Sequence, residues 1–179
     1  MYVTPKISQG EAHDILSKKI RPLPLRIRKR PVSLKRIEVT YVPYYVFEIR
    51  TAGKEGTQRA AIAVDGLTGT AMLFAEDDLT FETEGDTVSC NAVLSRIEAE
   101  RIATEEYRRL LMEQGLRNKR MPSAGKMTGG RIIFYPFWIG YVKKGQSYDF
   151  MAIDAVSGEP QGVRMRKVLL KAFRQMNVS

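Results

Sequence analysis

Cysteine and histidine are almost absent: the 179 residues contain one of each, Cys90 and His13. A single cysteine excludes an intrachain disulfide. Zinc sites usually need several Cys or His ligands, which this chain does not supply. A Ser-His-Asp or Cys-His catalytic arrangement would have to use His13, and no nucleophile motif surrounds that residue. We therefore expect no metal, no cofactor and no enzymatic activity.

Long apolar runs are also lacking. No stretch approaches the roughly 18 consecutive apolar residues of a membrane-spanning helix. The start, MYVTPKISQGEAH, lacks the charged and apolar regions of a signal peptide. The sequence therefore predicts a cytoplasmic protein without a transmembrane segment, unless a leader or anchor has been trimmed. The stretch GKMTGG at 125–130 is not framed by a strand and a helix, so it does not predict a phosphate loop.

Negative charge is scarce in the second half of the chain. The formal net charge is +9. Residues 1–90 carry 13 Lys and Arg against 12 Asp and Glu, whereas residues 91–179 carry 16 against 8. A basic half of this kind is typical of proteins that bind nucleic acid or another anionic surface, although solvated loops also carry such charge.

What the sequence does contain is an internal repeat with three landmarks in the same order. The first is a capping box, S-x-x-E, at Ser8 and again at Ser95, which predicts two helix starts. The second is an aromatic stretch around a proline, at 41–49 and 134–142. The third is a turn, VDGLTG at 64–69 and IDAVSG at 153–158. Three matches in order indicate a duplication.

Each repeat is expected to form one helix followed by three or four antiparallel strands. The second helix is predicted to end near Gly115, where glycine can adopt the left-handed conformation. Proline has no N–H, so Pro43 and Pro136 are expected where a strand begins or bends. Asp65 and Asp154 lack a second carboxylate at ligand spacing and are expected to stabilise turns.

The fold class is therefore α+β: two tandem units, each with one helix packed on its own 3–4-stranded antiparallel sheet, plus a C-terminal helix. The expected boundaries are 1–80 for the first repeat, 81–93 for a linker, 94–163 for the second repeat and 164–179 for an amphipathic helix.

This order of elements resembles the PepSY-type module of the cystatin-like fold. The matching residues are Ser8, Glu11, Ala12 and 64–69, then Ser95, Glu98, Ala99 and 153–158. The resemblance implies a binding role, or the inhibition or regulation of peptidases, and it implies no catalytic residues. The aromatic-proline stretches are not part of it.

Four aromatic residues on the predicted strands have two interpretations: Tyr44, Tyr45, Phe137 and Trp138. Both faces of these strands are apolar, which favours cover on both sides. One side would lie under the unit's own helix and the other against the second unit. The alternative is an exposed aromatic surface that binds a partner.

Two basic connectors form a candidate anionic-ligand patch. Its residues are Arg26, Arg28, Lys29 and Arg30 in the first connector, and Arg117, Lys119 and Arg120 in the second. The tail helix adds Arg164, Lys167, Lys171 and Arg174 beside an apolar stripe, so it predicts docking on its own domain, on a membrane or on a partner.

Two functions follow. The first is a non-enzymatic binding or regulatory module that engages another protein, or a second copy of itself, by a sheet edge or an aromatic groove. The alternative is a binder of nucleic acid or an acidic membrane surface that uses the basic connectors and the tail helix.

Overall fold

The computed structural model describes residues 1–179 except 21–31, 54–55, 75–78, 84–89, 120–123 and 177–179. Within the described residues the chain is an α+β protein with three helices and a mixed sheet of seven strands. In chain order the elements are β1 (Tyr2–Val3), α1 (Gln9–Ile20), β2 (Val32–Gly53), β3 (Gly56–Asp65), β4 (Ala71–Phe74), β5 (Phe81–Glu82), α2 (Arg96–Asn118), β6 (Lys126–Lys144), β7 (Ser147–Asp154) and α3 (Val163–Met176).

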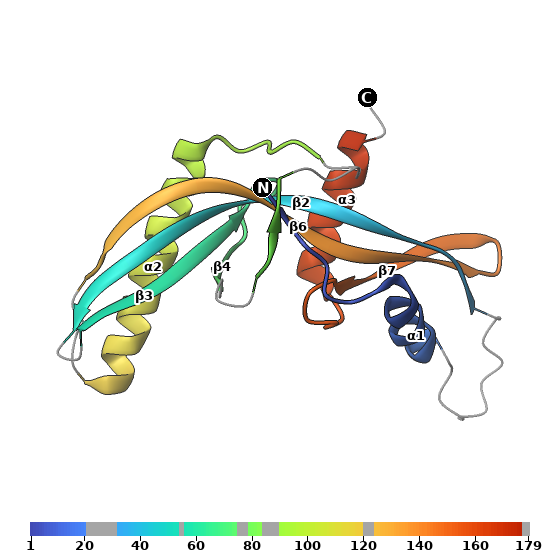
Figure 1. The fold of residues 1–179 in the computed structure, drawn as a ribbon, viewed down its shortest axis with the longest axis horizontal. Helices are drawn as coiled ribbons and strands as arrows, with labels where there is room; N and C mark the ends of the chain where they lie inside the picture. Colours follow the sequence, from blue (N-terminus) through green and yellow to red (C-terminus); the bar gives the residue numbers. More distant parts are fainter. Residues whose placement is uncertain (21–31, 54–55, 75–78, 84–89, 120–123, 177–179) are drawn as a thin grey trace.

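The two long strands β2 and β6 form the spine of the sheet (Figure 1). They pair antiparallel from Val32 opposite Lys144 to Arg50 opposite Lys126, and Val42 lies opposite Tyr135 near the middle. The second half of β2 also pairs with β3, and the second half of β6 with β7. Because β2 and β6 run in opposite directions, each half of the sheet contains the start of one long strand and the end of the other.

Both prolines lie inside the long strands, and neither begins one. Pro43 is paired opposite Phe134. Its carbonyl accepts from the N–H of Gly66 (2.7 Å), and the carbonyl of Pro136 accepts from that of Ala155 (3.2 Å). In an antiparallel strand the N–H and C=O of one residue point to the same side. The missing proline N–H groups therefore face away from the β2–β6 ladder, which loses no hydrogen bond.

The expectation that each helix packs on its own sheet is wrong, because the surface under each helix is built from strands of both repeats. Ala12 and Leu16 of α1 pack with Ile153 of β7, from the second repeat, and with Leu34 and Ile37 of β2, from the first. Ala99 and Ala103 of α2 pack with a cluster of β2 and β3 residues that includes Ile62 of the first repeat. In Figure 1, α1 and α2 lie at opposite ends of the sheet. The cause is the long β2–β6 pairing, which brings the end of each repeat beside the start of the other.

A glycine lets α1 approach the sheet closely. A Cβ at Gly140 of β6 would lie 2.8 Å from Cδ1 of Leu16 and 2.9 Å from Cδ1 of Leu34. Such distances leave no room for a side chain, so this contact requires glycine. The matching position in the first repeat is Phe47, which is buried against α2. The two halves therefore share a plan but differ in how closely their helices pack.

The third helix covers the other face of the sheet. Residues of β2 alternate: Tyr44 and Val46 lie in the cluster that includes α3, whereas Tyr45 and Phe47 lie under α2. The buried side of α3 consists of Met165, Val168, Leu169 and Ala172. Contact between the two units was expected to cover this face. Instead α3 covers it, because the units lie side by side in one sheet.

Three smaller expectations concern the capping boxes, the end of α2 and the last strand of the second repeat. Both capping boxes are present, at Ser8 and Ser95. The helix α2 does not end at Gly115; it continues to Asn118, and Lys119 takes the left-handed conformation (φ 52°) while its N–H bonds to the Gly115 carbonyl. The last strand expected in the second repeat is reduced to an isolated bridge between Ile153 and Pro160.

Candidate functional site

The four candidate aromatic residues belong to the core. Tyr44, Tyr45 and Phe137 are 3%, 6% and 2% exposed, and Trp138 is partly buried. Tyr45 packs under α2, and Trp138 packs in the cluster that contains α1. The structure therefore gives these side chains internal partners, and they do not form an exposed surface for a ligand.

Two of these aromatic residues hold the loops that lead into the helices. The hydroxyl of Tyr45 donates to the carbonyl of Leu94 (2.8 Å), and Nε1 of Trp138 donates to the carbonyl of Ile7 (2.8 Å). Leu94 and Ile7 each precede the capping serine of a helix. Tyr45 and Trp138 also occupy matching positions of the sequence repeat, so the same contact occurs in each half of the molecule.

The basic connectors are described only in part. Arg26, Arg28, Lys29, Arg30 and Arg120 lie outside the described residues. Arg117 and Lys119 are exposed at the C-terminal end of α2. The expected patch is therefore represented here by these two residues alone.

The aspartates of the repeated turns bind backbone groups. Oδ1 and Oδ2 of the buried Asp65 accept from the N–H groups of Leu67 (3.1 Å), Thr68 (2.6 Å) and Thr70 (2.6 Å), and from the Thr68 hydroxyl (2.7 Å). Asp154 accepts from Val156 and Ser157 in the same way. Within the described residues no group of three or more His, Cys, Asp or Glu side chains could hold a metal ion.

Three partly or fully buried side chains, Tyr135, Tyr141 and Cys90, have a raised pKa and are neutral at neutral pH. Burial, and then Asp154, raise the pKa of Tyr135, whose hydroxyl donates to Oδ2 of that residue (3.0 Å). Burial, and then the hydrogen bond to Glu38, raise the pKa of Tyr141 in the same way. Burial raises the pKa of the Cys90 thiol to about 11. Such groups hold the fold together, and none of them is poised as a nucleophile at neutral pH.

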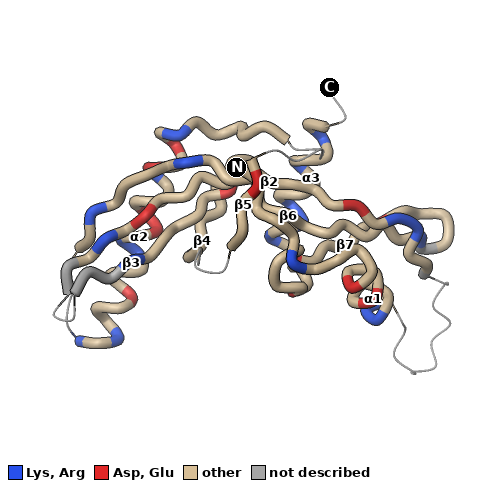
Figure 2. Tube along the Cα trace, viewed as in Figure 1, with Lys and Arg blue, Asp and Glu red and all other residues tan. Residues whose placement is uncertain are grey.

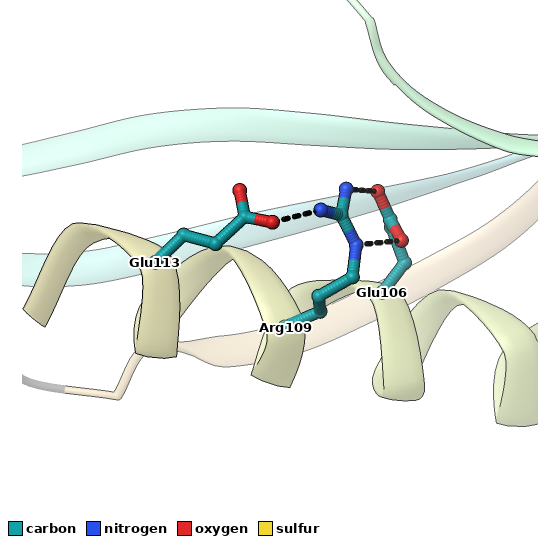
Figure 3. Close-up of polar contacts among 3 residues, drawn as sticks. All are labelled: Glu106, Arg109 and Glu113. Atoms are coloured by element: carbon teal, nitrogen blue, oxygen red, sulfur yellow. Dashed lines mark hydrogen bonds and ion pairs between the residues drawn. The ribbon is translucent and has the colours of Figure 1, made fainter. Parts of the chain in front are cut away.

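The charges on α2 are balanced and paired. Its sequence carries five Arg and five Glu. Arg109 binds both carboxylate oxygens of Glu106, through Nε (2.9 Å) and a terminal nitrogen (2.5 Å), and also contacts Glu113 (Figure 3). Arg101 pairs with Glu105 at 2.7 Å. Two of the five arginines of α2 are therefore paired with glutamates of the same helix, and its total charge is balanced.

The charges on α3 are neither balanced nor fully paired. Its sequence carries five Lys and Arg and no Asp or Glu, and Figure 2 shows these cations along the helix. Arg166 pairs with Asp149 (2.5 Å) and lies over the Phe150 ring at 4.3 Å. The other four cations, which we call the α3 basic face, are Arg164, Lys167, Lys171 and Arg174.

All four residues of the α3 basic face are exposed. Nζ of Lys171 donates to the carbonyl of Leu67, which ties α3 to the turn between β3 and β4. Within the described part of the chain, Arg164, Lys167 and Arg174 form no ion pair. Their positions at i, i+3 and i+10, with Lys171 at i+7, place them on one side of the helix.

A cleft adjoins this face. It has a volume of about 380 Å³ and lies between the turn after β3 and the start of α3. Arg164 lines one wall, and Asp65 and Thr70 line the other. The α3 basic face is thus continuous with a largely apolar cleft that carries a few polar groups.

The helical spacing in the sequence predicts the four cations of this face, but it does not predict the ion pair of the fifth cation, Arg166. Sequence reasoning grouped Arg164, Lys167, Lys171 and Arg174 by their helical spacing and did not assign a partner to Arg166. The Asp149 that neutralises Arg166 lies 17 residues earlier, on β7. Only the packing of α3 against β7 reveals that pair.

Comparison with protein-family models, with curated proteins and with solved structures finds no match. In the described part of the chain, no helix has the length and apolar character needed to cross a membrane.

Proposed function

We propose that this protein is a non-enzymatic binding module that engages an anionic partner through the α3 basic face. One observation carries this proposal: α3 has five cations and no acidic residue, whereas α2 has five of each. Both helices are exposed on one side, so solubility alone does not explain the difference. Exposed cations that lack acidic neighbours are the electrostatic footprint of binding to anions.

The scaffold under this face is proposed to consist of two cystatin-like units of PepSY type that share one sheet, so that each helix contacts strands of both units. Support comes from contacts that recur in both halves. The N–H groups of Val93 and Leu94 bond to the carbonyl of Gly66, and those of Lys6 and Ile7 bond to that of Ala155. In this arrangement α3, which has no helical counterpart among the described residues between β4 and α2, is the element available for a specialised role.

Retention on a heparin resin tests the proposed function. We compare the protein with the variant R164Q/K167Q/R174Q, which leaves Lys171 and its bond to Leu67 intact. The matched control, K18Q/K19Q/R108Q, removes three exposed cations from α1 and α2. The proposal expects the α3 variant to elute at clearly lower salt than the control. Equal elution of the two variants would show that net charge alone sets retention, and would contradict the proposal.

A protein partner is the second candidate, and the edge of β2 favours it. Among the described residues, Val32–Thr40 pair with β6 alone. An exposed strand edge is a template on which another chain can add a strand. If copies of this protein associate there, amide exchange across 32–40 slows as protein concentration rises. Exchange that is independent of concentration would contradict self-association through this edge.

A further inference from the structure

We propose that the partner of the α3 basic face is the phosphate backbone of a double-stranded nucleic acid. This inference rests on the proposed function, because it names the class of anion that the face binds. It concerns the backbone and not the bases, so it implies binding without sequence preference.

The spacing of the cations suits a linear polyanion. Arg164 and Arg174 are ten residues apart, which corresponds to about 15 Å along the helix axis. Lys167 and Lys171 lie between them on the same side. A duplex carries one negative charge per roughly 1.7 Å of its axis, so about 15 Å of duplex offers several phosphates to four cations. A single small anion would engage only one end of this row.

The burial of α3 argues against a membrane. A helix that binds a bilayer inserts its apolar face about 5–10 Å below the headgroups. Here the apolar side of α3 is occupied by the core: Val168, Leu169 and Ala172 are 2% exposed or less. Only Val163 and Leu170 are exposed apolar residues on this helix. The helix can present charge to a surface but has little with which to insert.

The aromatic residues near α3 argue against a single-stranded partner. Proteins that bind single strands stack bases on exposed aromatic rings beside a basic groove. The rings next to α3 are turned inward: Phe150 is buried, and Phe173 packs edge-on against it with ring centroids 5.2 Å apart. Among the described residues, the exposed ring of Tyr148 is on the same face of β7 as Phe150 but already lies beside Lys143. The rings that pack against α3 itself are not free to stack a base, so binding to α3 is expected to be driven by phosphates.

Fluorescence anisotropy with a labelled 20-base-pair DNA of arbitrary sequence tests the inference. With about four phosphate contacts, affinity should fall roughly 100-fold between about 50 and 200 mM salt. The variant R164Q/K167Q/R174Q should bind at least about 10-fold more weakly at the lower salt, with a shallower salt dependence. The control K18Q/K19Q/R108Q should stay within about 3-fold of the unsubstituted protein, because its cations lie off this face.

Further arms of the experiment separate the remaining outcomes. The variant R164K/K167R/R174K retains every charge and should keep the affinity for duplex, which excludes a loss caused by altered packing. Circular dichroism checks that all variants are folded. A matching single strand should bind more weakly than the duplex, and equal or stronger binding would overturn the preference for double strands.

Vesicles that contain about 30% phosphatidylserine provide the competing anion. If they bind in a manner that depends on α3 while duplex does not, the nucleic-acid inference is overturned and the proposed anionic function stands. If heparin, duplex and vesicles all bind without dependence on α3, both proposals are overturned.

Discussion

Cys90 belongs to the core, although it lies in the segment that was expected to be a linker. It lies within 81–93, is 3% exposed, and donates from Sγ to the carbonyl of Tyr41 at 3.7 Å. It packs in the same cluster as Val3, which occupies the matching position before the first helix. The connection between the repeats is therefore packed into the core at Cys90.

The raised pKa of Cys90 predicts an unreactive thiol. Burial raises its pKa from 9.0 to about 11. The thiolate is the reactive form, so at pH 8 its fraction should be about 100-fold lower than in the unfolded chain. Ellman's reagent should therefore react with the folded protein far more slowly than with the protein in urea. Rapid reaction of the folded protein would show that the thiol is accessible.

The same pKa shift predicts how stability depends on pH. In the unfolded chain the thiol ionises near pH 9, whereas in the folded protein it stays neutral up to about 11. This contribution to the free energy of unfolding is therefore complete below pH 9 and is lost as the pH rises towards 11. The variant Cys90→Ala, which has no thiol, should show a shallower fall across this range in urea titrations. An identical fall in both proteins would contradict the raised pKa.

Local chemistry explains which residues could be assigned from sequence. A capping serine and a turn aspartate act on backbone groups within five residues, as Ser95 and Asp65 do. Sequence reasoning therefore identified both. The predicted end of α2 was wrong because a glycine allows a helix to end but does not force it to end. Gly115 is buried within α2, and Lys119 takes the left-handed conformation instead.

At the scale of elements, the hydrogen bonds of Tyr45 and Trp138 test whether each helix is held by strands of the other repeat. Tyr45 holds the loop before α2, and Trp138 holds the loop before α1. Each bond joins residues of different repeats. Loss of one such bond costs about 1 kcal/mol, equivalent to roughly 5-fold faster local opening.

Hydrogen exchange should therefore respond across the repeats. The variant Trp138→Phe should speed exchange in α1 by at least about 5-fold and leave α2 unchanged. Tyr45→Phe should do the reverse, so each variant serves as the control for the other. If Trp138→Phe instead loosened α2, the helix of its own repeat, the contact between Trp138 and the loop before α1 would not be the one that holds the helix.

The helices and strands were predictable, but the packing of each helix on strands of both repeats was not. Capping boxes, β-branched residues and turns report on local conformation, so the helices and most strands follow from them. Whether α1 packs on its own strands or on those of the other repeat depends on long-range pairing. Both repeats present similar apolar strands, Tyr45 to Ile49 and Trp138 to Val142, so the pattern alone does not distinguish the two arrangements.

The same limit applies to the candidate site. The sequence distinguished the cations of α3 from its apolar stripe. It favoured cover on both faces of the aromatic strands, but it could not show that α3 covers one of those faces. Nor could it show that the apolar side of α3 would be occupied by the sheet.

At the scale of the whole molecule, the shared sheet predicts that both halves unfold together. The strands β2 and β6 pair from one end of the molecule to the other, and each helix covers strands from both repeats. Each core cluster contains residues of both repeats, so neither repeat can keep its core if the other unfolds. Trp138, the only tryptophan, reports on the half that contains α1.

The variant Ile62→Ala places the disturbance in the opposite half. Ile62 is fully buried under α2, so its truncation should cost roughly 3 kcal/mol. Because the halves are coupled, Trp138 fluorescence and far-UV circular dichroism should shift to the same lower urea midpoint. The control Leu73→Ala, at a position 62% exposed, should change neither signal appreciably. A Trp138 transition that stays in place while the circular dichroism transition broadens would show that the two halves unfold independently.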